Sequence, residues 1–296
     1  MALFAGGTEH GPGTPDPYDH GADNAPSPNW AGIEDWSSSS SFFHYVHGEF
    51  TQPTVDTCSG SDPSTVLIWV GIGGVGYNTP LLQNGTLSDE SVTTGPYAWW
   101  EAIDPVHNHD TLTVPVPASK MPVSHGDDIS LTTKYVNAAK PYVQFHWHND
   151  AADGHTYVYY LDVYGTQDDD PKTGYDEKTV PGHIANYYSG DSAEAIDERA
   201  GYTVSGTHYL SRLRPHTTVH WTDMRSSYDD DTHSVPMRSI QRFNLTMTNA
   251  YKHKADRVDL EEANVPTDAT AAQVNDVHDH CGQYEPRPTG SWPPSS

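Results

Sequence analysis

The sequence predicts an all-β fold, an antiparallel β-sandwich of two packed sheets with little helix. The 296 residues include 24 glycines, 23 prolines and 18 tyrosines, the usage of strands and turns rather than of helices. Short apolar stretches alternate with turn clusters, which is the rhythm of a sandwich. No stretch approaches the ~18 apolar residues that a membrane helix needs, so we expect a soluble protein without a membrane partner.

The strands are expected where β-branched and aromatic residues cluster between turn signals. These runs are 42–50, 65–72, 97–103, 110–116, 128–136, 142–148, 155–165, 202–210, 216–224 and 240–248. Only two stretches favour a helix, 191–199 and 268–280, of which the second begins with an aspartate suited to a cap.

The chain is expected to form one domain over residues 29–284. Residues 1–28 are rich in Gly, Pro, Asp and His, and we interpret them as a disordered lead or the remnant of a propeptide. They lack the basic and apolar regions of a signal peptide, so a signal was trimmed or never existed. The Pro-rich residues 285–296 are expected to be a mobile tail.

The net charge of the chain argues against anionic partners. Forty acidic and 15 basic side chains give a formal charge of −25. Such a surplus repels the phosphates of nucleic acids and anionic membrane surfaces, so we expect neither as a partner.

The two cysteines, Cys58 and Cys281, show no metal-ligand spacing. In an oxidising compartment they can close a disulfide that contributes about 4 kcal/mol by loop entropy. The alternative is a pair of buried free thiols.

The 18 histidines include three H-x-H pairs, at 107/109, 146/148 and 278/280. On a strand such a pair shares one face, as the ligands of zinc or copper do. No third ligand is evident in the sequence, so neither a metal nor a cofactor is expected. A surface that changes charge between about pH 5 and 7 explains the histidines more simply.

The common hydrolase signatures are absent: there is no G-x-S-x-G elbow, no H-E-x-x-H helix and no D-T/S-G loop. What remains is a series of segments in a fixed order. They are NWAG (29–32), LIWVGIGG (67–74), LLQNGT (81–86), YAWWEAIDP (97–105) and SAEAIDER (192–199).

These segments resemble the glutamic peptidases, also called eqolisins and formerly classed as peptidase family A4, in the manner of a divergent bacterial or archaeal-type member. The family pattern has an N-W-A-G, a W-V-G-I-D-G strand, an L-Q-x-G segment fourteen residues after its Trp, a W-x-E strand and an A-E-W-I-x-E strand. Trp69 and Gln83 show this spacing of fourteen. The resemblance implies a concanavalin-like, jelly-roll sandwich and a secreted, monomeric, acid-acting endopeptidase whose substrates are proteins or peptides.

Carried over by motif, the catalytic glutamine of the family falls on Gln83 and its catalytic glutamate on Glu198, the second Glu of AEAIDE. Motif position and strand alternation assign six residues to the substrate groove: Trp69, Gly73, Tyr97, Trp99, Glu101 and Glu194. A glycan on the sequon residue Asn84, next to Gln83, would obstruct this groove.

The two residue types suit peptide hydrolysis. A carboxylate can take a proton from water and later give it to the leaving amine, and a carboxamide N–H can stabilise the developing oxyanion. Glu194 is expected on the same strand face as Glu198, and a second carboxylate nearby raises the pKa of one member of the pair.

Two departures from the family keep alternatives open, because Gly73 replaces an Asp and Ala195 replaces a Trp. They favour reduced or absent activity, or a lectin-like or adhesion sandwich that binds without cleaving. The other alternative is a β-glucanase-type glycoside hydrolase, since EAIDE (194–198) is similar to E-x-D-x-E. Ile196 at the middle position argues against it.

Overall fold

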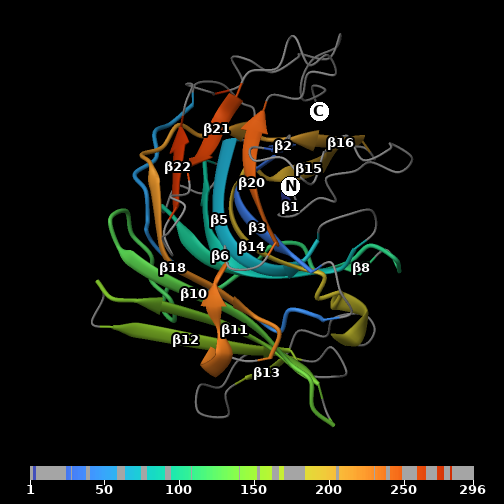
Figure 1. Cartoon of the computed structure of the whole chain (residues 1–296). Coiled ribbons are helices and arrows are strands. Elements are labelled where there is room, and N and C mark those ends of the chain that lie inside the picture. The colour runs from blue at the N-terminus through green and yellow to red at the C-terminus, as the bar shows by residue number, and fades with distance from the viewer. Residues whose placement is uncertain are drawn as a thin grey trace.

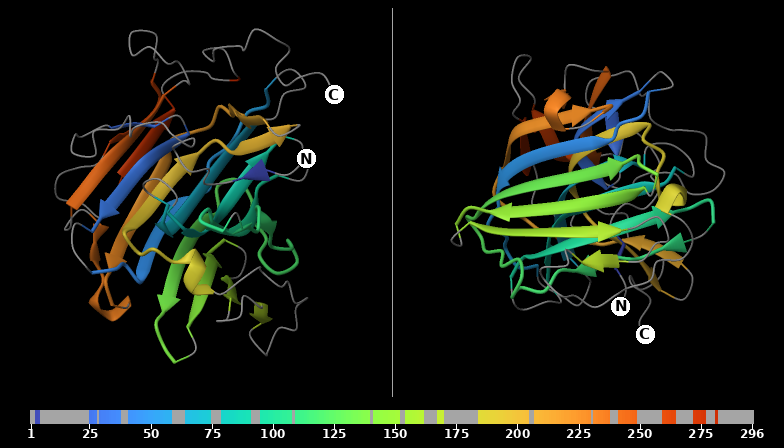
Figure 2. Two further views of the ribbon diagram at one scale, coloured as in Figure 1. Left: turned by 90° about the vertical axis from the view of Figure 1, so that its right-hand side faces the viewer. Right: turned by 90° about the horizontal axis from the view of Figure 1, so that it is seen from below.

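The computed structural model of the chain shows two curved antiparallel sheets packed face to face (Figures 1 and 2), which confirms the predicted fold class. It describes residues 3–4, 25–27, 29–37, 41–58, 64–74, 79–90, 95–107, 109–139, 141–151, 154–161, 167–169, 184–204, 207–229, 231–237, 241–248, 259–264, 272–276 and 281. The described helical elements include two short 3-10 turns, η1 (Ile184–Tyr187) and η2 (Asp231–His233), and none of the described helices could cross a membrane.

The first sheet is built from six long strands that pair in the order β7-β6-β5-β14-β3-β20. They are β3 (Trp30–Trp36), β5 (Ser64–Gly73), β6 (Leu81–Asp89), β7 (Tyr97–Asp104), β14 (Ser192–Glu198) and β20 (Gln241–Thr248). Short strands extend its edges: β2 (Ala25–Ser27), β8 (His109–Asp110) and β9 (Val114–Pro115). A further short strand, β17 (Arg212–Leu213), pairs with the beginning of β5, where β14 no longer does.

The second sheet pairs in the order β18-β4-β10-β11-β12-β13. Its strands are β4 (Tyr45–Thr51), β10 (Asp128–Val136), β11 (Tyr142–Asn149), β12 (His155–Leu161), β13 (Gln167–Asp169), β18 (Val219–Ser227) and β19 (Val235–Pro236).

Two strands join the sheets along one side, β21 (Asp259–Asn264) and β22 (Ala272–Asp276). β21 pairs with β20 of the first sheet, and β22 pairs with β18 of the second. A separate small sheet contains β1 (Leu3–Phe4), β15 (Gly201–Val204) and β16 (Thr207–Leu210).

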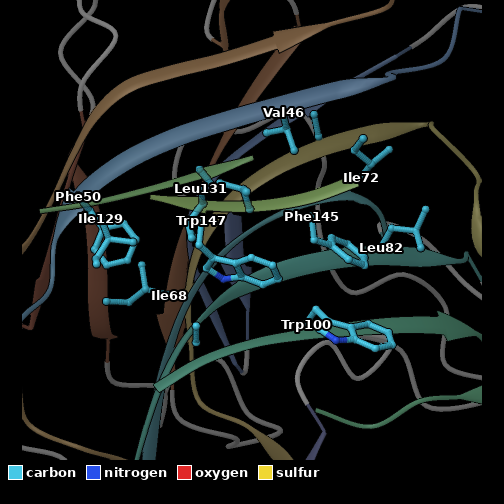
Figure 3. Close-up of a cluster of buried hydrophobic side chains, with 14 of the residues drawn as sticks. Val46, Phe50, Ile68, Ile72, Leu82, Trp100, Ile129, Leu131, Phe145 and Trp147 are labelled. Atoms are coloured by element: carbon cyan, nitrogen blue, oxygen red, sulfur yellow. The ribbon is translucent and has the colours of Figure 1, made fainter. Parts of the chain in front are cut away.

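The core fills the space between the two sheets (Figure 3). Because side chains alternate along a strand, every second residue of each sheet points inward. Ile68 and Trp100 come from the first sheet, and Leu131, Phe145 and Trp147 come from the second; all five are buried. Each such side chain stabilises the fold by about 1.5–3 kcal/mol through removal of its apolar surface from water.

The strand predictions are confirmed in part. The run at 128–136 coincides with β10, whereas 202–210 divides into β15 and β16. Both helix predictions are wrong: 191–199 contains β14, and 268–280 contains β22. β14 is bonded on both edges by β3 and β5, and such pairing outweighs local helix propensity. The tail at 285–296 lies outside the described residues.

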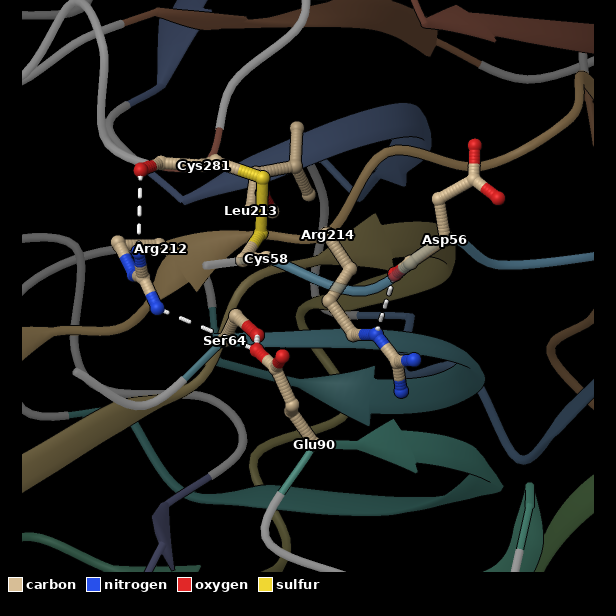
Figure 4. Close-up of a disulfide and its surroundings, with 8 residues drawn as sticks. All are labelled: Asp56, Cys58, Ser64, Glu90, Arg212, Leu213, Arg214 and Cys281. Carbon is tan, nitrogen blue, oxygen red and sulfur yellow. Dashed lines mark hydrogen bonds and ion pairs between the residues drawn. A yellow bond between two sulfur atoms is a disulfide. The ribbon is translucent and has the colours of Figure 1, made fainter. Parts of the chain in front are cut away.

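The predicted disulfide between Cys58 and Cys281 is present, with a Cα–Cα distance of 5.3 Å (Figure 4). Arg212 donates a hydrogen bond to the carbonyl oxygen of Cys281 at 3.3 Å. Arg214 donates to the carbonyl oxygen of Asp56 at 3.0 Å, two residues before Cys58. These contacts attach the segment around Cys281 to the beginning of the first sheet.

Candidate active site

Polar residues form a row across the first sheet, on the face that points away from the sandwich core. The strand register places Glu34 opposite Glu194, Glu194 opposite Gly71, Gly71 opposite Gln83 and Gln83 opposite Glu101. The row therefore runs from β3 through β14, β5 and β6 to β7. All four polar side chains are buried, with exposures of 0 or 1%.

Gly71 contributes no side chain to the middle of this row. A Cβ atom at this position would lie 2.7 Å from the ring of Trp69 and 3.1 Å from the side chain of Leu81, so these two side chains cover the glycine. The register places Gln83 and Glu194 on either side of Gly71, with their backbones two strands apart, which is about 10 Å. Glutamine and glutamate side chains are long enough to approach one another over this distance.

Gln83 is oriented by its other neighbour in the row. Its amide Nε2 donates a hydrogen bond to Glu101 Oε2 at 3.3 Å. An amide in an apolar wall would otherwise lose its hydrogen bonds to water. The hydrogen bond to Glu101 thus fixes the orientation of the Gln83 amide, with its NH₂ group toward Glu101.

Glu194 has the most perturbed carboxyl group of the row. Burial raises its pKa well above the ordinary value, and the nearby carboxylate of Glu34 raises it further. The nearby hydroxyl group of Ser192 opposes this shift without cancelling it. A buried carboxyl with a raised pKa is the form that can donate as well as accept a proton near its working pH.

Glu198 lies in a different row, opposite Leu67. Its carboxylate accepts a hydrogen bond from Trp69 Nε1 at 2.7 Å and one from Asn29 Nδ2 at 3.2 Å. Glu198 is four residues along β14 from Glu194, so its backbone is about 16 Å from that of Gln83. The register therefore does not bring together the pair predicted from the motifs, Gln83 and Glu198.

The aromatic residues expected in the groove lie in the row between that of Gln83 and that of Glu198. Trp69 and Trp99 are buried on the same face as Gln83, where they pack with Leu67 in a second apolar cluster. Trp30 contacts Trp69 edge to face, with ring centroids 5.1 Å apart. Tyr97 lies at the margin and is partly exposed.

The two positions that depart from the family have structural explanations. Gly73 ends β5 with φ at +87°, and a Cβ atom there would lie 2.2 Å from the carbonyl oxygen of Pro80. This backbone cannot accept an aspartate. Ala195 belongs to the cluster between the sheets, so it faces the core and not the groove. The small side chain of Ala195 therefore removes no contact from the groove.

Asn84 faces the core as well. Its Nδ2 donates to the carbonyl oxygen of His146 at 3.0 Å, and its Oδ1 accepts from Thr133 at 2.7 Å. The folded protein therefore has no room for a glycan at this sequon, and the expected obstruction of the groove does not arise.

Glu34 and Asn29 are site residues that the motif analysis missed. Glu34 follows the NWAG segment, and period-two alternation from Trp30 places it on the face of the groove. That signal is present in the sequence. The hydrogen bond of Asn29 to Glu198 joins residues 169 positions apart, and no local pattern predicts it.

Comparisons with known proteins agree with this architecture. The model of the Peptidase A4 family matches residues 28–158. Two solved structures of scytalido-glutamic peptidase, each with a transition state analog, have a TM-score of 0.56 and are 17% and 18% identical. SCP-B, a member of the Eqolisin family in complex with the tripeptide Ala-Ile-His, has a TM-score of 0.54 and 17% identity.

Each of these structures covers 84% of this chain, and the likeness spans 98% of each. No curated protein matches the chain. The family match and the shared fold confirm the resemblance to the glutamic peptidase family that the ordered motifs predicted.

Proposed function

We propose that this protein is an endopeptidase that hydrolyses peptide bonds with the carboxyl group of Glu194 and the carboxamide of Gln83. The observation that carries the proposal is their common row, on either side of Gly71. A glutamate and a glutamine that flank one glycine on the same face can act on one water molecule and one carbonyl group. The predicted partner, Glu198, is too far along β14 to do so.

The reaction divides between the two side chains. Ionised Glu194 accepts a proton from water, and the water oxygen bonds to the carbonyl carbon of the substrate. The amide N–H of Gln83 stabilises the negative charge on the carbonyl oxygen. When the C–N bond breaks, Glu194 returns the proton to the leaving nitrogen.

The raised pKa of Glu194 supports this double role. The protonated form persists above the ordinary carboxyl range, because burial disfavours the charge and Glu34 adds a like charge. The group therefore changes protonation state at a higher pH than an exposed glutamate.

Glu198 is assigned a positioning role. Its carboxylate holds the indole of Trp69, whose ring lies beside the position where a Gly71 side chain would be. It thereby fixes the ring that covers Gly71, without touching the reacting atoms. All of these side chains are buried.

The carboxylate spacing disfavours the glycoside hydrolase alternative. Glu194 and Glu198 share a face but are four residues apart, which is about 13 Å along a strand. Glycosidases keep their two carboxyl groups about 5–9.5 Å apart. Asp197, the remaining acid of the segment, is 3.7 Å from His216 and belongs to a different cluster.

The disulfide supports the further proposal that the protein is secreted. The bond between Cys58 and Cys281 is of a type that persists in oxidising compartments and is rare in the cytosol.

Cleavage of an acid-denatured protein by the purified chain tests the proposal. Gln83→Ala should lower kcat by about 10²–10³, the usual cost of one oxyanion donor. Glu194→Gln should lower kcat further, since it removes the proton carrier. Glu198→Gln should act mainly on KM, because it changes only the support of Trp69.

The opposite ranking would contradict this assignment. If Glu198→Gln abolishes cleavage and Glu194→Gln leaves it intact, the carboxylate predicted from the motif is the correct one. Binding of peptide without cleavage by the unmodified chain would favour the lectin-like alternative. Cleavage of a glucan without proteolysis would favour the glycosidase.

A further inference from the structure

A cluster of three possible metal ligands lies on the outer face of the second sheet. His47 and Glu49 are two residues apart on β4 and therefore share a face, and Asp223 comes from the neighbouring strand β18. One ligand atom from each lies within 4.8 Å of the other two. The cluster belongs to the opposite sheet from the proposed catalytic row.

The distances within this cluster leave room for an ion. His47 Nε2 is 3.6 Å from Glu49 Oε1 and 3.9 Å from Asp223 Oδ2, too far for hydrogen bonds. A tetrahedral ion that binds N and O at about 2.1 Å keeps its ligand atoms roughly 3.4 Å apart. A small inward movement of the three side chains would therefore bring their ligand atoms to the spacing that such an ion requires.

Two further residues aim the ligand atoms at one point. His47 Nδ1 is 3.0 Å from the hydroxyl of Thr132, so the other ring nitrogen, Nε2, faces the carboxylates. Arg225 Nε donates to Asp223 Oδ1 at 2.7 Å and leaves Oδ2 on the side of His47. Such outer contacts are what orient histidine and carboxylate ligands around metals.

The backbone of β18 departs from regular pairing to present Asp223. The register with β4 shifts between Thr222 and Arg225, and Asp223 adopts a φ of +46°. Trp221 and Met224 are buried, whereas Thr222 is exposed and Asp223 partly so. The bulge therefore inserts an extra outward residue, in a conformation that costs free energy for a residue other than glycine.

Solvent reaches the cluster. The side chains of His47, Glu49 and Asp223 are 13%, 47% and 42% exposed. An ion can enter from water, and water can complete its coordination shell. The same surface contains the H-x-H pair at 146/148 that the sequence left without a third ligand. His148 is bonded to Thr156 and Asp150, so it is engaged elsewhere.

A second cluster of the same composition lacks this space. His216 Nε2 is 2.5 Å from Glu261 Oε1 and 3.7 Å from Asp197 Oδ2, and all three side chains are buried. Burial lowers the pKa of His216, but the two carboxylates outweigh it and raise the pKa to about 10. A hydrogen-bonded ion pair fills this site, and an ion would have to break it.

We propose that His47, Glu49 and Asp223 bind one divalent transition-metal ion of the zinc type, completed by water. One imidazole and two carboxylates are ligands that such ions accept. The ion would link β4 to β18 on the surface. The proposal is independent of peptide hydrolysis, because no residue of the cluster belongs to the catalytic row.

Calorimetric titration of chelator-treated protein with Zn²⁺ tests this proposal, with thermal unfolding as a second readout. We expect one equivalent to bind and to raise the Tm. Glu49→Gln and Asp223→Asn should each weaken binding at least about tenfold, with loss of the Tm increase. Both replace partly exposed side chains, so the fold should tolerate them. The control Asp150→Asn, at the neighbouring His148 pair, should bind Zn²⁺ like the unmodified chain.

Three results would overturn the proposal. The first is no saturable binding of Zn²⁺ to the unmodified chain. The second is binding that persists in Glu49→Gln and Asp223→Asn but disappears in Glu261→Gln, which would assign the ion to the buried cluster. The third is loss of binding in Asp150→Asn, which would assign it to the H-x-H pair.

Discussion

The two sheets of the sandwich differ in what their outer faces do. β10 and β11 alternate between buried and more exposed residues along their whole length, as expected for a sheet with one face in water. β5, β6 and β14 are buried at every position, although β6 and β14 contain Gln and Glu. Buried polar groups on a strand are costly, and this cost supports the proposal that the first sheet carries the catalytic row.

The comparison predicts that equal packing damage will have unequal consequences in the two sheets. Gly71→Ala in β5 and Gly48→Ala in β4 each place a methyl group 2.7 Å from a tryptophan ring, Trp69 and Trp221 respectively. Both substitutions should destabilise the fold by about 1–3 kcal/mol through overpacking. Only Gly71→Ala should lower kcat/KM at least about a hundredfold, because the new methyl group displaces the Trp69 ring beside the proposed catalytic side chains.

Urea unfolding and peptide cleavage, measured on both variants, check this prediction. Equal activity losses in the two glycine variants would mean that general destabilisation, and not the packing over Gly71, limits the reaction.

Two tryptophans allow a second comparison of the sheets. Trp69 donates its indole N–H to the carboxyl group of Glu198 at 2.7 Å, and Trp147 donates to the carbonyl oxygen of Gly85 at 3.1 Å. Replacement by Phe removes the same volume from two fully buried sites. Trp69→Phe should cost about 1.5–3 kcal/mol for the bond to a charged acceptor, and Trp147→Phe about 1 kcal/mol for the neutral one.

Chemical denaturation of the two Phe variants gives the difference directly. The contrast between the sheets would be unsupported if Trp147→Phe were the more damaging change, or if Glu198→Gln left the cost of Trp69→Phe unaltered.

The sequence predicted the second sheet better than the first for a physical reason. The period-two pattern at 128–136 is the signature of a half-buried strand, and β10 has these bounds. β14 has polar residues on a buried face, so its pattern also suited a helix. The motifs located Gln83 in the row, but Glu194 and Glu198 share a strand face. Only pairing through β5 shows which of them stands opposite Gly71.

The smallest expected effect concerns stability and pH. The pKa of Glu194 is raised above its ordinary value of 4.5 by burial and then by Glu34, so the folded state keeps a proton that the unfolded chain releases. Stability therefore falls as the pH rises from that value through the raised pKa. Glu194→Gln removes this penalty and should unfold at a higher temperature than the unmodified chain at neutral pH. Below the ordinary carboxyl pKa the two should converge.

Thermal unfolding of both proteins over a pH series checks the sign. The exposed Asp150→Asn serves as control and should change stability by no more than about 0.5 kcal/mol. The opposite sign would be a Glu194→Gln protein that is less stable than the unmodified chain at neutral pH and equally stable in acid. That result would show that the Glu194 charge is stabilised in the folded protein. The proposed proton carrier would then lack the perturbed environment on which its double role depends.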